Sequence, residues 1–115
     1  MSWTIFSTAI KGRNKTQCQD ATYAAKTGRH IILAVADGVG SHRHSALGSH
    51  RAIQLVRSLS PRLLESSLPS QDICRRLFSQ VVHQWSRWAH SLPAADTYAP
   101  QFNNVQTTFA IAVIE

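Results

Sequence analysis

The chain has 115 residues, of which 43% are hydrophobic and 16% are charged, and its formal net charge is +6. This length fits one domain, and the composition excludes an intrinsically disordered chain. No apolar run reaches the roughly 18 residues of a membrane span, and the first ten residues lack the pattern of a secretory signal peptide. We therefore expect a cytoplasmic protein without a membrane partner.

The basic residues are spread along the whole chain, with only Arg75 and Arg76 adjacent to each other. Proteins that bind nucleic acids usually concentrate positive charge on one face or tail, so this pattern favours solvated helix faces. A small basic nucleic-acid-binding module stays as a minor alternative. Cys18 and Cys74 form no CxxC pair and no disulfide framework, which predicts two reduced thiols.

The first half of the chain reads as three strands. Residues 3–10 alternate in polarity and predict a short strand, and residues 20–25 predict a second. A turn follows, in which Gly28 is free to take a positive φ. Residues 30–36 predict the third strand, and because their apolar run does not alternate, we expect both faces of this strand to be buried.

Two helices are predicted next. Residues 45–66 place apolar side chains on one broad stripe, with Pro61 predicting a kink or break near Ser60. Ser70 is expected to cap the second helix, because Asp72 then falls in the first turn, where negative charge is favourable.

The second helix is predicted to run for about five turns, with Trp85 and Trp88 on its apolar stripe as core residues. After a loop, the β-branched and apolar residues 107–114 predict a last strand. The predicted order is therefore β-β-β-α-α-β. The chain stops directly after this strand, so we expect residues 1–115 to be part of a domain that is truncated at its C-terminus.

A carboxylate stands where the third strand ends. Asp37 follows the buried run directly, and Gly38 and Gly40 allow a tight turn and the close approach of a backbone carbonyl to a ligand. Carboxylate and carbonyl oxygens suit a hard cation such as Mg²⁺ or Mn²⁺. On its own, Asp-Gly is a common strand-ending turn.

A second carboxylate is expected beside the first. If the turn at Gly28 joins two paired strands, Asp20 and Asp37 lie at the same end of a hairpin, with Arg13 and Lys15 in the loop that precedes Asp20. Carboxylates for a metal next to cations for a phosphate form the layout that metal-assisted phosphoester hydrolysis needs.

These residues carry a family resemblance. The stretch from about Ala9 to Ala52 resembles the metal-dependent protein phosphatases of type 2C, and it is most similar to a bacterial branch of them. The likeness spans nearly the whole chain but only about the first half of a family domain. Its motifs are Lys11-Gly12, Cys18-Gln19-Asp20-Ala21, Ala34-Val35-Ala36-Asp37-Gly38-Val39-Gly40-Ser41 and Gln106-Thr107-Thr108-Phe109-Ala110.

The resemblance implies an α+β fold with four layers, in which two antiparallel sheets are sandwiched between helix pairs. It implies that Asp37 bridges two divalent cations, Mn²⁺ or Mg²⁺, that the Gly38 carbonyl binds one of them, and that Asp20 binds or orients water at the metals. Arg13 and Lys15 would hold the substrate phosphate. The implied activity is hydrolysis of phosphoserine or phosphothreonine in a protein by a metal-activated water.

The sequence departs from the family pattern at several positions. Gln19 stands where many relatives carry Glu, Lys15 where relatives often carry Arg, and Val39 where some carry a proposed general-acid His. Lys binds phosphate as a point charge, without the bidentate geometry of Arg. The later aspartates of the family would lie beyond Glu115.

The shortage of acidic residues limits the activity we expect. Two divalent ions bring a charge of about +4, whereas Asp20 and Asp37 supply about −2. We therefore expect residues 1–115 alone to be inactive, with the remaining half of the domain, or a partner that covers the last strand, completing the site. The alternative is a catalytically inactive phosphatase-like domain that binds a phosphoprotein or acts as a regulatory scaffold.

A histidine cluster offers a competing metal site. His42, His44 and His50 follow the Asp-Gly turn, but no cysteine or fourth ligand has a suitable spacing for zinc. We interpret these residues as exposed polar side chains.

Overall fold

The computed structural model describes residues 5, 7–9, 18–38, 44–92 and 105–115. They form three strands and two long helices. In chain order these are β1 (Asp20–Thr27), β2 (His30–Gly38), α1 (Ser45–Leu64), α2 (Ser70–His90) and β3 (Thr107–Ile114). The last strand has the bounds that the sequence predicts.

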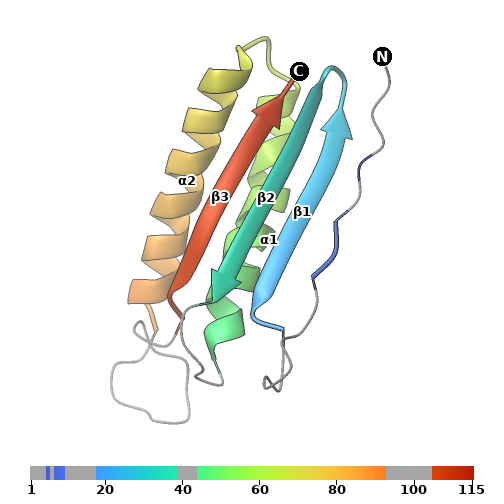
Figure 1. The fold of residues 1–115 in the computed structure, drawn as a ribbon. Helices are drawn as coiled ribbons and strands as arrows, with labels where there is room; N and C mark the ends of the chain where they lie inside the picture. Colours follow the sequence, from blue (N-terminus) through green and yellow to red (C-terminus); the bar gives the residue numbers. More distant parts are fainter. Residues whose placement is uncertain (1–4, 6, 10–17, 39–43, 93–104) are drawn as a thin grey trace.

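The strands form one antiparallel sheet in the order β1-β2-β3, and both helices pack on the same face of it (Figure 1). Helix α1 contacts β1 and β2, and α2 lies along β3. The α+β class is therefore confirmed. The described residues form two layers and contain one sheet, so the four-layer sandwich stays a prediction.

A two-residue turn fixes the register of the first two strands. Gly28 has a φ of 57°, and no other described residue has a positive φ. A positive φ at the first central residue only is the pattern of a type II′ turn, whose twist matches that of a hairpin. The register then runs from Thr27 opposite His30 to Asp20 opposite Asp37, as predicted.

Beyond Ile31, which is 4% exposed, strand β2 is buried on one face only. Ile32, Ala34 and Ala36 face the helices and are at most 3% exposed, whereas Leu33 and Val35 on the other face are 37% and 53% exposed. The expectation that both faces are buried is wrong at Leu33 and Val35, because no described element covers the second face there. The apolar run nevertheless has the composition of a strand covered on both sides.

The core lies between the sheet and the helices. Its fully buried members include Ile32 from β2, Val56 from α1, and Ile73, Leu77 and Val81 from α2. Helix α2 thus buries the stripe that its sequence predicts.

The two tryptophans of α2 lie at the margin of this core and are half-buried. The indole Nε1–H of Trp85 donates a hydrogen bond of 3.0 Å to the carbonyl of Gly48 in α1, which satisfies its polar atom. The rings of Trp85 and Trp88 meet edge to face at 5.8 Å. The structure therefore supports their assignment as packing residues.

Helix α1 continues through Pro61 to Leu64, so the break predicted near Ser60 is not present. Proline has no N–H, and a continuous helix at this position leaves the Arg57 carbonyl without its usual donor four residues later. Pro61 lies in the last turn, where little helix follows it, and this placement limits the cost.

Helix α2 begins one position earlier than the predicted cap requires. The N-cap is Pro69, with φ −60° and ψ 152°, and no side chain caps the helix. Ser70 is the first helical residue, and its buried Oγ has no hydrogen-bond partner among the described residues. The capping role predicted for Ser70 is therefore wrong, although Asp72 does lie in the first turn.

Half of the residues of the strand predicted over 3–10 lie outside the described residues. Ile5 and residues 7–9 are described, and none of them is in a strand. Among the described residues, no helix is both long enough and apolar enough to span a membrane.

Candidate functional site

Two carboxylates stand side by side where the β1–β2 hairpin ends. Asp20 and Asp37 are opposite each other in the register, and both are exposed on the face of the sheet that the helices leave open. The next pair outward is hydrogen-bonded, with the Gly38 N–H donating to the Gln19 carbonyl at 2.9 Å. Asp20 and Asp37 are therefore a non-hydrogen-bonded pair, in which the Cα atoms are about 4.5 Å apart and the side chains approach closely.

The end of the hairpin is attached to α1. The Gln19 carbonyl accepts a second hydrogen bond from the hydroxyl of Ser49, a fully buried residue in the first turns of α1. One backbone oxygen thus joins β1, β2 and α1. This junction fixes the positions from which the two carboxylates project.

Strand β3 adds hydroxyl groups beside Asp37. Thr108 is the register partner of Asp37, and the hydroxyls of Thr107 and Thr108 lie 3.0 and 3.4 Å from the backbone carbonyl of Asp37, to which they donate. Neither threonine was predicted as a site residue from the sequence. The sequence feature that could have indicated them is their position at the start of the last predicted strand, because that strand is expected to pair with one of the earlier strands.

A hollow lies over the carboxylates on the open face of the sheet. Besides Asp20 and Asp37 its lining consists of small, apolar and hydroxyl-bearing residues: Thr8, Ala9, Ala21, Thr22, Val35, Ala36, Thr108, Phe109 and Ala110. The polar side chains among them end in oxygen atoms, which is the donor type that Mg²⁺ and Mn²⁺ prefer.

The oxygen ligands at this site are of the type that a hard cation prefers, but they are too few to hold two ions. Two carboxylates directly opposite each other repel, and a cation between them would relieve that repulsion. Within the described part of the chain, however, no three His, Cys, Asp or Glu residues are grouped closely enough to hold a metal. A two-metal centre here needs further acidic ligands.

The predicted phosphate-binding residues Arg13 and Lys15 lie outside the described residues, and so do Val39, Gly40 and His42 of the segment after Gly38. Gly38 is described and buried as the last residue of β2. His50 lies on the side of α1 that faces β1, where it lines a different cavity. The described histidines thus give no support to the zinc alternative.

The model of the family described as protein phosphatase 2C matches residues 11–115. The chain belongs to this family. Searches of curated proteins and of solved structures gave no significant match. The protein phosphatase 2C match includes Asp20, Asp37 and Gly38, as well as strand β3.

Membership of the protein phosphatase 2C family confirms the resemblance noted in the sequence and makes a phosphatase domain the framework for the site. The family generally depends on divalent metal ions. This dependence agrees with the oxygen-bearing lining of the hollow around Asp20 and Asp37. The assignment to a bacterial branch stays a prediction.

Proposed function

We propose that this chain is the N-terminal part of a metal-dependent protein serine/threonine phosphatase domain. The observation that carries the proposal is the register pair Asp20–Asp37 at the open end of the hairpin, in a member of the protein phosphatase 2C family. The proposed substrate is a phosphoserine or phosphothreonine in a protein, and the proposed location is the cytoplasm.

Each site residue has a proposed role. When bound, two divalent cations, Mn²⁺ or Mg²⁺, supply Lewis acidity and an activated water. Asp37 would contact both ions, the Gly38 carbonyl one of them, and Asp20 would hold or orient water beside them. Arg13 and Lys15 would bind the substrate phosphate, with Lys15 acting as a point charge.

The proposed domain is completed by parts beyond the described elements. A second sheet packed on the open face would cover Leu33 and Val35, which accounts for an exposed apolar surface next to the carboxylates. The same half would supply the missing acidic ligands. This arrangement is the four-layer sandwich that the sequence predicts.

Phosphate release from a phosphoserine peptide in Mn²⁺ tests the proposal. The endogenous protein, whose intact mass shows whether its chain exceeds 12.8 kDa, is compared with the 115-residue chain. We expect activity only where the domain is complete. In that domain, Asp37→Asn should reduce the rate at least about a hundredfold, because a bridging ligand is lost.

The matched control is Asp72→Asn, which removes the same charge from the start of α2 and should leave the rate unchanged. Equal activity of the Asp37 and Asp72 variants in the complete domain would contradict the proposal. Turnover by the 115-residue chain that disappears in Asp37→Asn would instead contradict our expectation that this chain is inactive.

The second candidate is a catalytically inactive domain that binds a phosphoprotein or acts as a scaffold. The small number of acidic residues grouped at the described site favours it. Calorimetric titration with Mn²⁺ separates the two candidates, because tight metal binding by the complete domain counts against an inactive one.

A further inference from the structure

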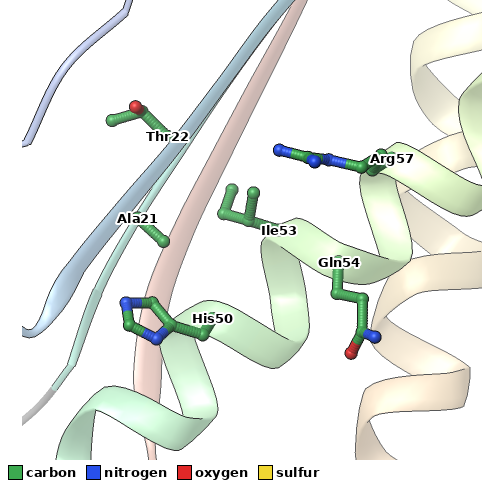
Figure 2. A pocket seen from close by; sticks show the side chains of 6 residues that line it. All are labelled: Ala21, Thr22, His50, Ile53, Gln54 and Arg57. Atoms are coloured by element: carbon green, nitrogen blue, oxygen red, sulfur yellow. The ribbon is translucent and has the colours of Figure 1, made fainter.

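A second cavity lies between β1 and α1, on the helix-covered side of the sheet. Its described lining consists of Ala21, Thr22, His50, Ile53, Gln54 and Arg57. Figure 2 shows His50, Ile53 and Arg57 on the side of α1 that faces β1, with Ala21 directed toward the helix. His50 and Arg57 are two helical turns apart, or about 10 Å along the axis.

The charge of this cavity is positive. No acidic residue is among its described lining residues, and neither His50 nor Arg57 forms an ion pair with the described part of the chain. Both side chains are exposed. Ala21 and Ile53 are buried and provide an apolar floor, and Gln54 supplies an amide group, whereas the Thr22 side chain points away from α1 (Figure 2).

Arg57 is held in place from one side. Its guanidinium carbon lies 5.4 Å from the centre of the Tyr23 ring, in the geometry of a cation–π contact. Stacking on a ring leaves the N–H groups in the guanidinium plane free to bind a carboxylate or phosphate. The contact therefore orients a cation without neutralising its charge.

This cavity and the carboxylate hollow lie on opposite faces of β1, which is an edge strand of the described sheet, and Ala21 and Thr22 line both of them. A ligand that reaches Asp20 and Asp37 on the open face enters the basic cavity by passing around the edge of β1. In an extended peptide, alternate residues are about 7 Å apart, and two of them can approach His50 and Arg57 together.

We propose that His50 and Arg57 bind acidic side chains of the phosphoprotein, next to its phosphoester group. The proposal rests on the proposed function, and it makes Arg57 a specificity-determining residue. It assigns to the enzyme a preference for phosphorylated segments that carry acidic residues at two alternate positions beside the phosphorylated residue.

Binding of two synthetic peptides to the 115-residue chain tests this inference. Both peptides contain one phosphoserine; one has glutamate at two alternate positions beside it and the other has glutamine. Isothermal titration calorimetry in the presence of a chelator measures affinity without hydrolysis. We expect the glutamate peptide to bind about fivefold more tightly, as exposed ion pairs allow.

Three variants locate the effect. Arg57→Gln should remove the preference for the glutamate peptide, whereas Arg57→Lys should retain part of it because the charge remains. Arg62→Gln is the matched control: Arg62 is exposed in the last turn of the same helix, on another side. It should leave the preference intact, and thermal unfolding followed by circular dichroism confirms that each variant is folded.

Equal affinity for the two peptides, no binding of either, or the same loss in Arg57→Gln and Arg62→Gln would overturn the inference. Hydrolysis by the complete domain is measured separately. A preference for glutamate without hydrolysis would overturn the proposed catalytic function alone. Hydrolysis without a preference would overturn this inference alone.

Discussion

At Gly48 an added methyl group would collide with the backbone of another segment. A Cβ atom at this residue would lie 1.5 Å from the backbone oxygen of Val105. The Gly48 carbonyl also accepts the hydrogen bond of Trp85. Because the obstruction is backbone, no side-chain rotation can relieve it, and α1 would have to move away from the segment that leads into β3.

We therefore expect Gly48→Ala to lower the free energy of unfolding by about 1–3 kcal/mol, the usual cost of overpacking. Urea unfolding followed by circular dichroism measures the change. Gly28→Asn is a comparison of a different kind, since nothing lies within 4 Å of an added Cβ there and only the positive φ of the type II′ turn strains the substitution. An unchanged free energy of unfolding in Gly48→Ala would contradict the contact with Val105.

Helix α1 contains a proline that costs it one backbone hydrogen bond. Pro61 is exposed and removes the N–H that would bond to the Arg57 carbonyl. Pro61→Ala should therefore raise the free energy of unfolding by about 1–2 kcal/mol, partly offset by the greater freedom of the unfolded chain. The midpoint of thermal unfolding measures this gain.

Arg62→Ala serves as the control for Pro61→Ala, because it changes an exposed neighbour in the same helical turn. It should shift the midpoint much less. A lower midpoint for Pro61→Ala would contradict this prediction. It would show that Pro61 stabilises the chain by setting the direction in which it leaves α1.

The open face of the sheet is the surface through which we expect the whole molecule to associate. Leu33, Val35 and Ile114 are exposed there at 37%, 53% and 39%, on the face opposite the helices. An exposed apolar sheet face is a site of association. We expect the 115-residue chain to self-associate through it when no other sheet covers that face.

Sedimentation velocity over a range of concentrations tests this expectation. The double variant Leu33→Thr/Val35→Thr places β-branched residues in the strand and should reduce self-association without loss of folding. Gln80→Thr/Gln84→Thr changes two exposed residues of α2 and should leave self-association as it is. The same concentration dependence in both double variants would show that association uses another surface.

The pairing of Asp20 with Asp37 was predictable because a short turn at Gly28 fixes it locally. The hydroxyls beside Asp37 were harder to predict, since Thr107 lies 70 positions away along the chain. The cavity at Arg57 was also beyond local patterns: periodicity gives the apolar stripe of a helix, but not which basic residues at its margin face a strand.

The start of α2 and the exposed face of β2 also depend on parts of the chain that are distant in sequence. Composition predicts a helix that starts near Ser70, yet the choice between Pro69 and Ser70 as its capping position depends on how the chain leaves α1. The exposed side of β2 has a similar origin. Its residues have the composition of a covered strand, whereas its burial depends on which other elements are present.

The hairpin that carries the carboxylates also affects the order in which the molecule can fold. A hairpin of this kind closes within roughly 1–10 μs, whereas the pairing of β2 with β3 must first bring together segments separated by both helices. Strand pairing that spreads from Gly28 reaches Asp20 and Asp37 last, where the two like charges oppose closure. A bound cation would therefore favour closure of the hairpin at Asp20 and Asp37, which forms before the rest of the domain.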